Sequence, residues 1–191
     1  MATRVTENNL QLAVTNRQII KIALPISFAI LIPQLNFITN NIFLGHFPDE
    51  GKSLAVAGVT GVYYLIFAAI GYGLNNGLQA LIARRAGENR PEEIGKLFNQ
   101  GVFIALAIAA IGITLTYLFV PSIFRHFIHD DLRLQQAIRF LKIRIWGLPF
   151  LYIYQMRNAL LVGTNQSKYL IAGTLAETLC NVFLDYALIF G

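Results

Sequence analysis

The amino-acid sequence predicts an all-α fold, a polytopic bundle of transmembrane helices, from three observations. Hydrophobic residues make up 55% of the 191 positions and charged residues only 13%, about half of what a soluble domain carries. The mean hydropathy is +0.56. Three windows, 22–44, 54–83 and 97–124, contain no charged residue. Because a helix needs about 20 mostly apolar residues to cross a bilayer, each window is long enough to do so.

The same composition excludes several other classes of protein. With 14 Phe and 8 Tyr, the chain is too apolar to be disordered. The single cysteine, Cys180, excludes a disulfide framework and a cysteine-based zinc site. The net charge is +5, but the basic residues stand at the edges of apolar runs, so we expect the lipid bilayer rather than nucleic acid as a partner. Because the sequence contains no Ser-His-Asp pattern, HExxH motif or Walker motif, we expect neither an enzyme nor a cofactor.

The chain begins with a polar segment, residues 1–18, that lacks the apolar core and cleavage site of a signal peptide. A first span follows at about 19–44. Pro25 and Pro33 remove backbone donors and are expected to bend it, as in transporter helices that line a binding site. Polar residues after the second proline either line a cavity or join helices by hydrogen bonds. They are Gln34, Asn36, Thr39, Asn40 and Asn41.

The second and third spans are expected at about 54–83 and 97–124, joined by the basic turn 84–93. Small residues let helices approach closely, so the glycines of the second span predict packing rather than a phosphate loop. They are Gly58, Gly61, Gly71, Gly73 and Gly77, and the same span carries the amides Asn75, Asn76 and Gln79. The segment 121–131 is expected to break the helix after the third span. Histidines in such a loop are more often solvated than metal-bound, so we expect no metal site at His126 and His129.

A fourth span is expected at about 140–162, beginning among Arg139, Lys142 and Arg144. Arg157 lies at membrane depth and requires a partner, for which Glu177 and Asp185 on the next span are the candidates. Such a pair would be a gate or a static brace. The candidates for lining or gating a cavity in the first, fourth and fifth spans are Gln34, Asn36, Tyr154, Arg157, Asn158 and Thr178.

The fifth span, at about 169–190 after the turn 163–168, carries the most informative pattern. Polar residues recur in it at three- and four-residue spacing, which places them on one face of a helix. They are Thr174, Glu177, Thr178, Asn181 and Asp185. Carboxyl groups held there can bind and release a proton, and ionised ones can hold Na⁺ together with neighbouring oxygens. The alternative is that a carboxylate lies near the membrane interface or pairs statically with Arg157.

The Lys and Arg residues of the loops predict the orientation of the chain. With the N-terminus inside, the inner segments hold eight Lys or Arg and the outer segments three, or six when Arg139, Lys142 and Arg144 are included. We therefore expect an integral membrane protein of the plasma membrane, the inner membrane of a bacterium, with residues 1–18 in the cytoplasm.

Four parts of the sequence follow a known order. They are IALPISFAILIPQLNFITNNIFLGHF (22–47), LAVAGVTGVYY (54–64) with GLNNGLQALIARRAGENRPEEIGKLFNQG (73–101), FLKIRIWGLPFLYIYQMRNALLVGTNQSKY (140–169) and NVFLDYALIFG (181–191). Each is unspecific alone. Together, over nearly the whole chain, they resemble the N-terminal half of a multidrug and toxic compound extrusion (MATE) transporter.

The resemblance implies twelve helices in two six-helix lobes around a central cavity, and export of small cationic amphipathic compounds in exchange for Na⁺ or H⁺. It also implies a cation site in the N-terminal lobe, built from an acid on the first helix and the Asn and Asp of the fifth. Asn181 and Asp185 match that pattern, but Asn40 stands where the acid would be. We expect Glu177 and Asp185 to form the ionisable pair, with Asn40 supplying a neutral oxygen.

By this resemblance, residues 19–191 form a partial N-terminal lobe with five of its six helices. We expect the chain to be part of a longer protein, to need the second lobe or a partner chain to form a cavity, and not to transport alone. Two other functions remain open. One is a flippase for lipid-linked oligosaccharides, which shares the superfamily fold and would line its cavity with several Arg or Lys. The other is a non-transporting membrane subunit.

Overall fold

The computed structural model describes residues 16–45 and 52–190, apart from some side chains of the first helix and at the start of the second and the end of the last. This part of the chain consists of helices joined by short turns and contains no strand, which confirms the all-α class. The elements are α1 (Asn16–Gly45), α2 (Lys52–Gly87), α3 (Pro91–Phe127), α4 (Asp131–Arg144), the 3₁₀ turn η2 (Ile145–Gly147), α5 (Leu148–Gly163) and α6 (Lys168–Phe190).

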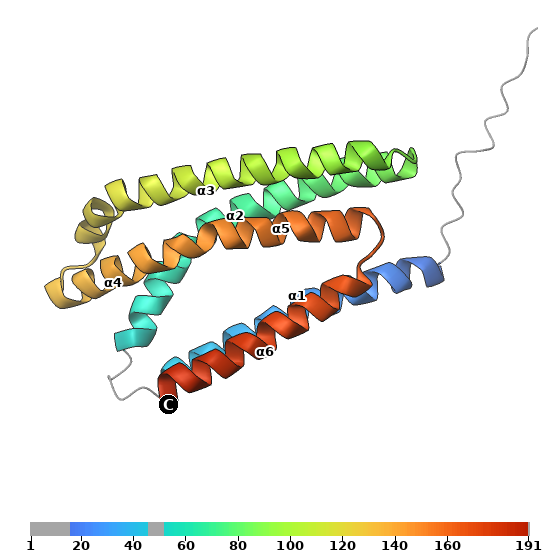
Figure 1. Ribbon diagram of the computed structural model, residues 1–191. Coiled ribbons are helices and arrows are strands. Elements are labelled where there is room, and N and C mark those ends of the chain that lie inside the picture. The colour runs from blue at the N-terminus through green and yellow to red at the C-terminus, as the bar shows by residue number, and fades with distance from the viewer. Residues whose placement is uncertain (1–15, 46–51, 191) are drawn as a thin grey trace, which may run out of the picture.

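Successive helices reverse direction, so that α1, α3 and α6 run one way and α2 and the α4–α5 pair run the other (Figure 1). The helices form two groups. In one, α2, α3 and α5 pack against each other, and in the other α1 lies along α6 (Figure 1). The second group has few contacts with the first. The polar face of α6 is therefore shared between its neighbour α1 and the space toward α2 and α5.

Close packing in the first group depends on small residues. The fully buried Tyr152 ring lies beside Gly71, where an added Cβ would be 2.9 Å from the ring, and the Tyr152 hydroxyl donates to the Phe67 carbonyl oxygen at 2.9 Å. A Cβ at Gly112 would lie 2.8 Å from the Phe67 ring. The packing role predicted for the α2 glycines is thus confirmed at Gly71. It is not found where an added Cβ would have no heavy atom within 4 Å, at Gly58, Gly73 and Gly77.

The third helix is longer than the sequence predicted. It continues through Pro121 to Phe127, so the expected break at 121–131 begins too early. A proline inside a helix removes one backbone hydrogen bond and usually bends or ends it. Here tertiary packing opposes that effect, because Val120 and Phe124 on either side of the proline belong to a buried cluster. The α4 residues of this cluster are Leu134, Ala137 and Leu141.

The predicted fourth span is divided between two helices. Asp130 caps α4, its side chain accepting from the backbone N–H groups of Leu132 and Arg133 at 3.0 and 3.3 Å, so the helix begins well before residue 140. The single turn η2 then connects α4 to α5, and the two helices continue in nearly the same direction (Figure 1).

Two helices meet the length and composition of a membrane span among the residues that the structure describes. They are α2 from Leu54 to Gly87 and α3 from Pro91 to Phe127, which contain 18-residue windows with mean hydropathies of 1.9 and 2.4. α5 has 16 residues, fewer than the about 20 needed, and reaches that length only together with the end of α4. The total of five spans stays a prediction.

The two turns at one end of the bundle share the sequence Gly-x-Asn. Asn89 follows the end of α2 and Asn165 follows the end of α5, and both have a positive φ, 57° and 59°. Asparagine tolerates this left-handed conformation because its short polar side chain can form local hydrogen bonds. Each asparagine comes two residues after a glycine that ends the preceding helix, so both hairpins close in the same way.

Candidate functional site

The first part of the candidate site lies where α1 packs against α6. The Asn40 amide Nδ2 donates to Oδ1 of Asn181 at 3.4 Å. Asp185 lies one helical turn further along α6, on the same face as Asn181. Oδ1 of Asn40 and Oδ2 of Asp185 are both buried and have no hydrogen-bond partner in the described part of the chain. We call these three residues the α1–α6 polar contact.

The α1–α6 polar contact has more acceptors than donors. A buried oxygen without a partner costs about 1–3 kcal/mol, and more when it carries charge. A bound cation or a proton on the carboxyl group would remove that cost, since both are attracted by amide and carboxylate oxygens. These oxygens therefore suit Na⁺ or H⁺. Of the predicted site residues, Asn40 and Asn181 are within hydrogen-bond distance, and Asp185 lies one turn further along the same face of α6.

The second part of the site is a cavity of about 770 Å³ between the two groups of helices. Its lining comes from α1, α2, α5 and α6, and in the described residues it includes one carboxylate, Glu177, and no Lys or Arg. We call it the amide cavity because most of its other polar lining residues are amides. The polar side chains are Asn75, Asn76, Gln79, Tyr154, Gln155, Asn158 and Glu177. Apolar and aromatic residues, among them Tyr72, Phe150 and Leu151, complete the wall.

The two carboxylates of α6 lie in different places. Glu177 is exposed and lines the amide cavity, whereas Asp185 is partly buried in the α1–α6 polar contact. Eight residues separate them, which is about 12 Å along a helix axis. Thr174 lies nearer the cavity side, with its hydroxyl 3.3 Å from that of Tyr154. Thr178 is half-buried between the two places.

Arg157 is placed differently from the sequence prediction. Among the ion pairs of the described residues, none joins Arg157 to Glu177 or Asp185. Its guanidinium group lies over the Tyr154 ring at 4.9 Å and donates to Oδ1 of Asn158 at 3.3 Å. A Cβ at Gly173 would lie 2.9 Å from both terminal nitrogens. The absence of a side chain on Gly173 therefore lets Arg157 pack directly on α6, where a ring and an amide take the place of the expected carboxylate.

Sequence reasoning assigned no site role to several residues of the amide cavity. Asn75, Asn76 and Gln79 stood out as polar residues of an apolar span, and Oδ1 of Asn75 is buried without a hydrogen-bond partner in the described part of the chain. Gln79 follows Asn75 by four residues and Asn76 by three, and this helical spacing is the signal that could have placed Gln79 beside both amides. Gln155 is only 3% exposed and lines the same cavity. The side chains of Gln34 and Asn36 lie outside the described residues.

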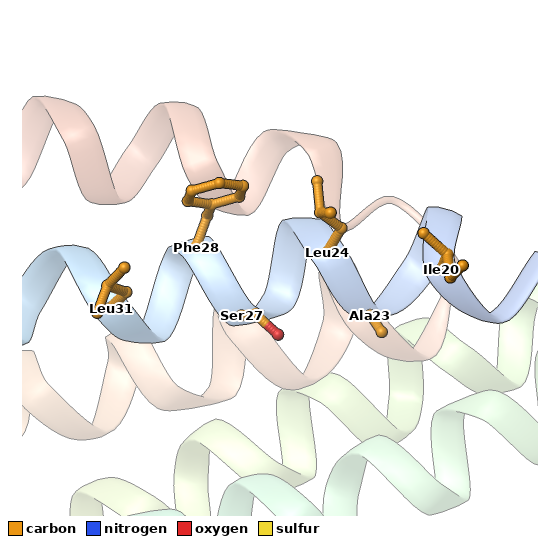
Figure 2. A pocket seen from close by; sticks show the side chains of 6 residues that line it. All are labelled: Ile20, Ala23, Leu24, Ser27, Phe28 and Leu31. Atoms are coloured by element: carbon orange, nitrogen blue, oxygen red, sulfur yellow. The ribbon is translucent and has the colours of Figure 1, made fainter.

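Another hollow lies along α1 alone, with a volume of about 420 Å³ (Figure 2). Its lining is apolar except for Ser27, and it includes Leu24 and Phe28, which are both largely exposed. This lining suits contact with apolar groups better than the binding of a polar ligand. In the described part of the chain, no group of three or more His, Cys, Asp or Glu side chains could hold a metal ion.

Comparison with known proteins adds a family to this geometry. A family model described as MatE matches residues 25–187. The chain is 23% identical over 175 residues to the probable multidrug resistance protein NorM of Synechocystis sp., covering 92% of this chain and 37% of the relative. It is 26% identical over 164 residues to the protein of the same name from Listeria innocua, covering 85% of this chain and 36% of the relative.

Solved structures show the same fold. One is the outward-facing conformation of a multidrug resistance MATE family transporter of the MOP superfamily, with a TM-score of 0.78 and 21% identity, covering 90% of this chain and 38% of that one. Another is a MOP superfamily transporter from Pyrococcus furiosus, with a TM-score of 0.79 and 20% identity over the same shares. The chain thus spans well under half the length of the proteins it resembles.

Proposed function

Since this chain belongs to the MatE family, we propose that it is the N-terminal part of a secondary transporter that exports small cationic amphipathic compounds in exchange for Na⁺ or H⁺. A longer protein carrying this chain would supply the second lobe that closes the transport cavity, or a partner chain would do so. The protein is proposed to lie in the plasma membrane, with residues 1–18 in the cytoplasm.

The observation that carries this proposal is the α1–α6 polar contact. Two buried oxygens, on Asn40 and Asp185, have no hydrogen-bond partner among the residues that the structure describes. Polar groups at membrane depth are costly, and in transporters they mark ion pathways. The proposed role of Asp185 is to carry the charge that attracts the cation, and that of Asn40 and Asn181 is to supply neutral oxygens.

The two-group packing suggests how cation binding acts on the substrate. α1 and α6 have few contacts with α2, α3 and α5, and the amide cavity separates the groups. A cation between α1 and α6 draws these helices together, and any shift of the pair changes the width of the cavity. Coupling of cation binding to substrate transport needs an element with two arrangements, whose equilibrium depends on both the bound cation and the bound substrate.

The cavity lining favours a cationic substrate over a diphosphate. Glu177 supplies a negative charge, Tyr72 and Phe150 supply aromatic surface, and the guanidinium of Arg157 packs against Tyr154 and Gly173 instead of entering the lining. A site for a lipid-linked diphosphate would need several cations in this position. In this proposal Glu177 binds the charged end of the substrate or exchanges a proton with it.

The test uses the complete protein that carries this chain, expressed in a drug-sensitive bacterium. Asp185→Asn and Glu177→Gln each remove one carboxylate with little change in shape, and both are expected to abolish growth in the presence of a cationic drug. Asp131→Asn and Glu92→Gln make the same chemical changes at exposed positions and are expected to leave resistance unchanged.

Binding of radioactive Na⁺ to the purified protein separates the two roles. For Na⁺ coupling, Asp185→Asn is expected to lose Na⁺ binding, while Glu177→Gln keeps Na⁺ binding and loses drug binding. If both variants protect cells as well as the wild type at matched expression, the proposed cation-coupled transport is wrong.

A further inference from the structure

The last turns of α4 and the turn η2 that follows carry basic and aromatic side chains on one face. We propose that Arg139, Lys142 and Trp146 bind the headgroup of an anionic phospholipid. This inference concerns a surface that shares no lining residue with the amide cavity, and it requires only that the helices lie in a membrane.

The height of this face along the bundle matches a membrane boundary. Trp146 contacts Tyr117 of α3, and Tyr117 lies 20 residues after Leu97, where the charge-free stretch of α3 begins directly after Lys96. A helix rises 1.5 Å per residue, so this distance is about 30 Å. The hydrocarbon core of a bilayer is also about 30 Å thick. Tryptophan and tyrosine are enriched at that boundary, where an apolar ring and a polar edge are both satisfied.

The aromatic side chains are held in place by hydrogen bonds. Nε1 of Trp146 donates to the Tyr117 hydroxyl at 3.0 Å, and this hydroxyl donates to the Lys142 carbonyl oxygen at 3.2 Å. The Lys142 ammonium lies over the Tyr117 ring, 5.3 Å from its centre. One phenol therefore fixes both the indole and the lysine, and a ligand bound there would not have to order them.

A concave surface lies next to these groups. It has a volume of about 480 Å³ and is lined by Gln135, Ile138, Arg139, Lys142 and Ile143. Arg139, Lys142 and Trp146 follow at three- and four-residue spacing, so they share one face of the helix. Ile143 is 69% exposed and Trp146 59% exposed, which leaves apolar surface beside the two cations. A phosphate between the cations and an acyl chain along the isoleucine and indole would satisfy both parts of this surface.

The charges of this region favour an anion. No Asp or Glu occurs between residues 132 and 176. Arg133 pairs with Asp130 at 3.2 Å, but Arg139 and Lys142 form no ion pair with any other residue that the structure describes. Their charges are therefore available to a phosphate group. A lipid fits better than a soluble phosphate because the concave surface opens among exposed apolar side chains.

Trp146 is the single tryptophan of the chain, so its fluorescence reports on this site directly. We would reconstitute the purified full chain in phosphatidylcholine vesicles that contain a minor fraction of brominated phosphatidylglycerol or, in a parallel sample, brominated phosphatidylcholine. The bromine atoms quench an indole that they touch. Stronger quenching by the anionic lipid at equal fractions is the expected result, and equal quenching by the two lipids would overturn the proposal.

Variants test the two cations. Arg139→Gln and Lys142→Gln are each expected to reduce the preference for phosphatidylglycerol about fivefold, the effect of one basic residue near an anionic membrane. Lys142→Arg keeps the charge and should keep the preference. Arg125→Gln removes an exposed charge of α3 outside this face and should leave it unchanged. An equal loss in all three glutamine variants would mean general attraction to the membrane and would refute a site.

Competition with free phosphate tests whether the site binds a lipid or a soluble anion. Excess inorganic phosphate is expected not to restore the fluorescence quenched by brominated phosphatidylglycerol, since it lacks the acyl chain that contacts Ile143 and Trp146. If it restores the fluorescence fully, the site binds soluble anions and the lipid assignment is wrong.

Discussion

Gly71 and Gly73 are two residues apart in α2, yet their surroundings differ. A Cβ at Gly71 would lie 2.9 Å from the buried Tyr152 ring, closer than carbon atoms can approach, while a Cβ at Gly73 would meet no heavy atom within 4 Å. Tyr152 cannot move away easily, because its hydroxyl is bonded to the Phe67 carbonyl oxygen in a close-packed core. The close approach of α2 to α5 at this point therefore requires glycine, because the methyl group of an alanine would overlap the Tyr152 ring.

Gly71→Ala is expected to lower the free energy of unfolding by about 1–3 kcal/mol, the usual cost of adding volume to a packed core. Gly73→Ala is the matched control. It is expected to be neutral or to stabilise by up to about 1 kcal/mol, because alanine has the higher helix propensity. Denaturant titration of both purified variants in the same detergent measures the difference. Equal stability of the two variants would show that α2 and α5 do not pack as described.

At the scale of elements, the turn between α2 and α3 is held by charged side chains. Arg85 contacts Glu88 at 2.6 Å and Glu93 at 2.9 Å, Arg84 contacts Glu88 at 3.1 Å, and Arg90 contacts Glu93 at 3.2 Å. Hydrogen bonds from Arg85 and then Arg84 lower the pKa of Glu88 from its ordinary value of 4.5. These groups are exposed, so the network orders the turn more than it stabilises the whole fold.

The pKa shift of Glu88 predicts how this turn responds to acid. Because its pKa is lower in the folded state, the ionised carboxylate stabilises the turn above pH 4.5, and this contribution is lost as the pH falls through the lowered value. Hydrogen exchange of the backbone amides of residues 88–90 is expected to accelerate there, relative to its intrinsic pH dependence. Glu88→Gln should remove this acid-dependent step.

Glu92 offers a control for the acid response. It lies near the same turn and forms no ion pair with the other residues that the structure describes. Glu92→Gln should therefore keep the acid-dependent step. If the wild-type turn exchanges as Glu88→Gln does at every pH, the charged network does not hold it in solution.

At the scale of the whole molecule, the alternating helix directions place the turns at two ends. The turns 88–90 and 164–167 lie at the end where α1 begins, and the turn 128–130 lies at the opposite end (Figure 1). Lys and Arg residues at the first end predict that it faces the cytoplasm. This orientation decides which leaflet of the membrane meets α4.

Cysteine labelling measures this orientation. In a Cys180→Ser background, His129→Cys is expected to react with a membrane-impermeant maleimide in intact cells, and Glu92→Cys only after the membrane is made permeable. Both positions are exposed, so accessibility within the protein does not limit the reaction. Labelling of the Glu92→Cys protein in intact cells would reverse the predicted topology.

Local features of the sequence were sufficient to predict the helices and their polar faces. One helix covers each of four predicted spans, and α4, η2 and α5 together cover the fourth in chain order, because apolar length and the absence of charge are local properties of the sequence. The match of Asn181 to the family pattern, and the position of Asn40, likewise pointed to two residues that meet between α1 and α6. The predicted helix boundaries were less accurate, since α3 continues through Pro121 and α4 starts before the predicted fourth span.

Only the tertiary structure decided which of these faces meet. The sequence put Glu177 and Asp185 on one stripe, but Glu177 lines the amide cavity, whereas Asp185 lies one turn beyond Asn181, which contacts Asn40 of α1. It gave Arg157 a carboxylate partner, whereas the space above Gly173 directs the guanidinium to Tyr154 and Asn158. Helical periodicity is a property of neighbouring residues. The partners of a face depend on packing between helices far apart in the chain, and no local pattern records that choice.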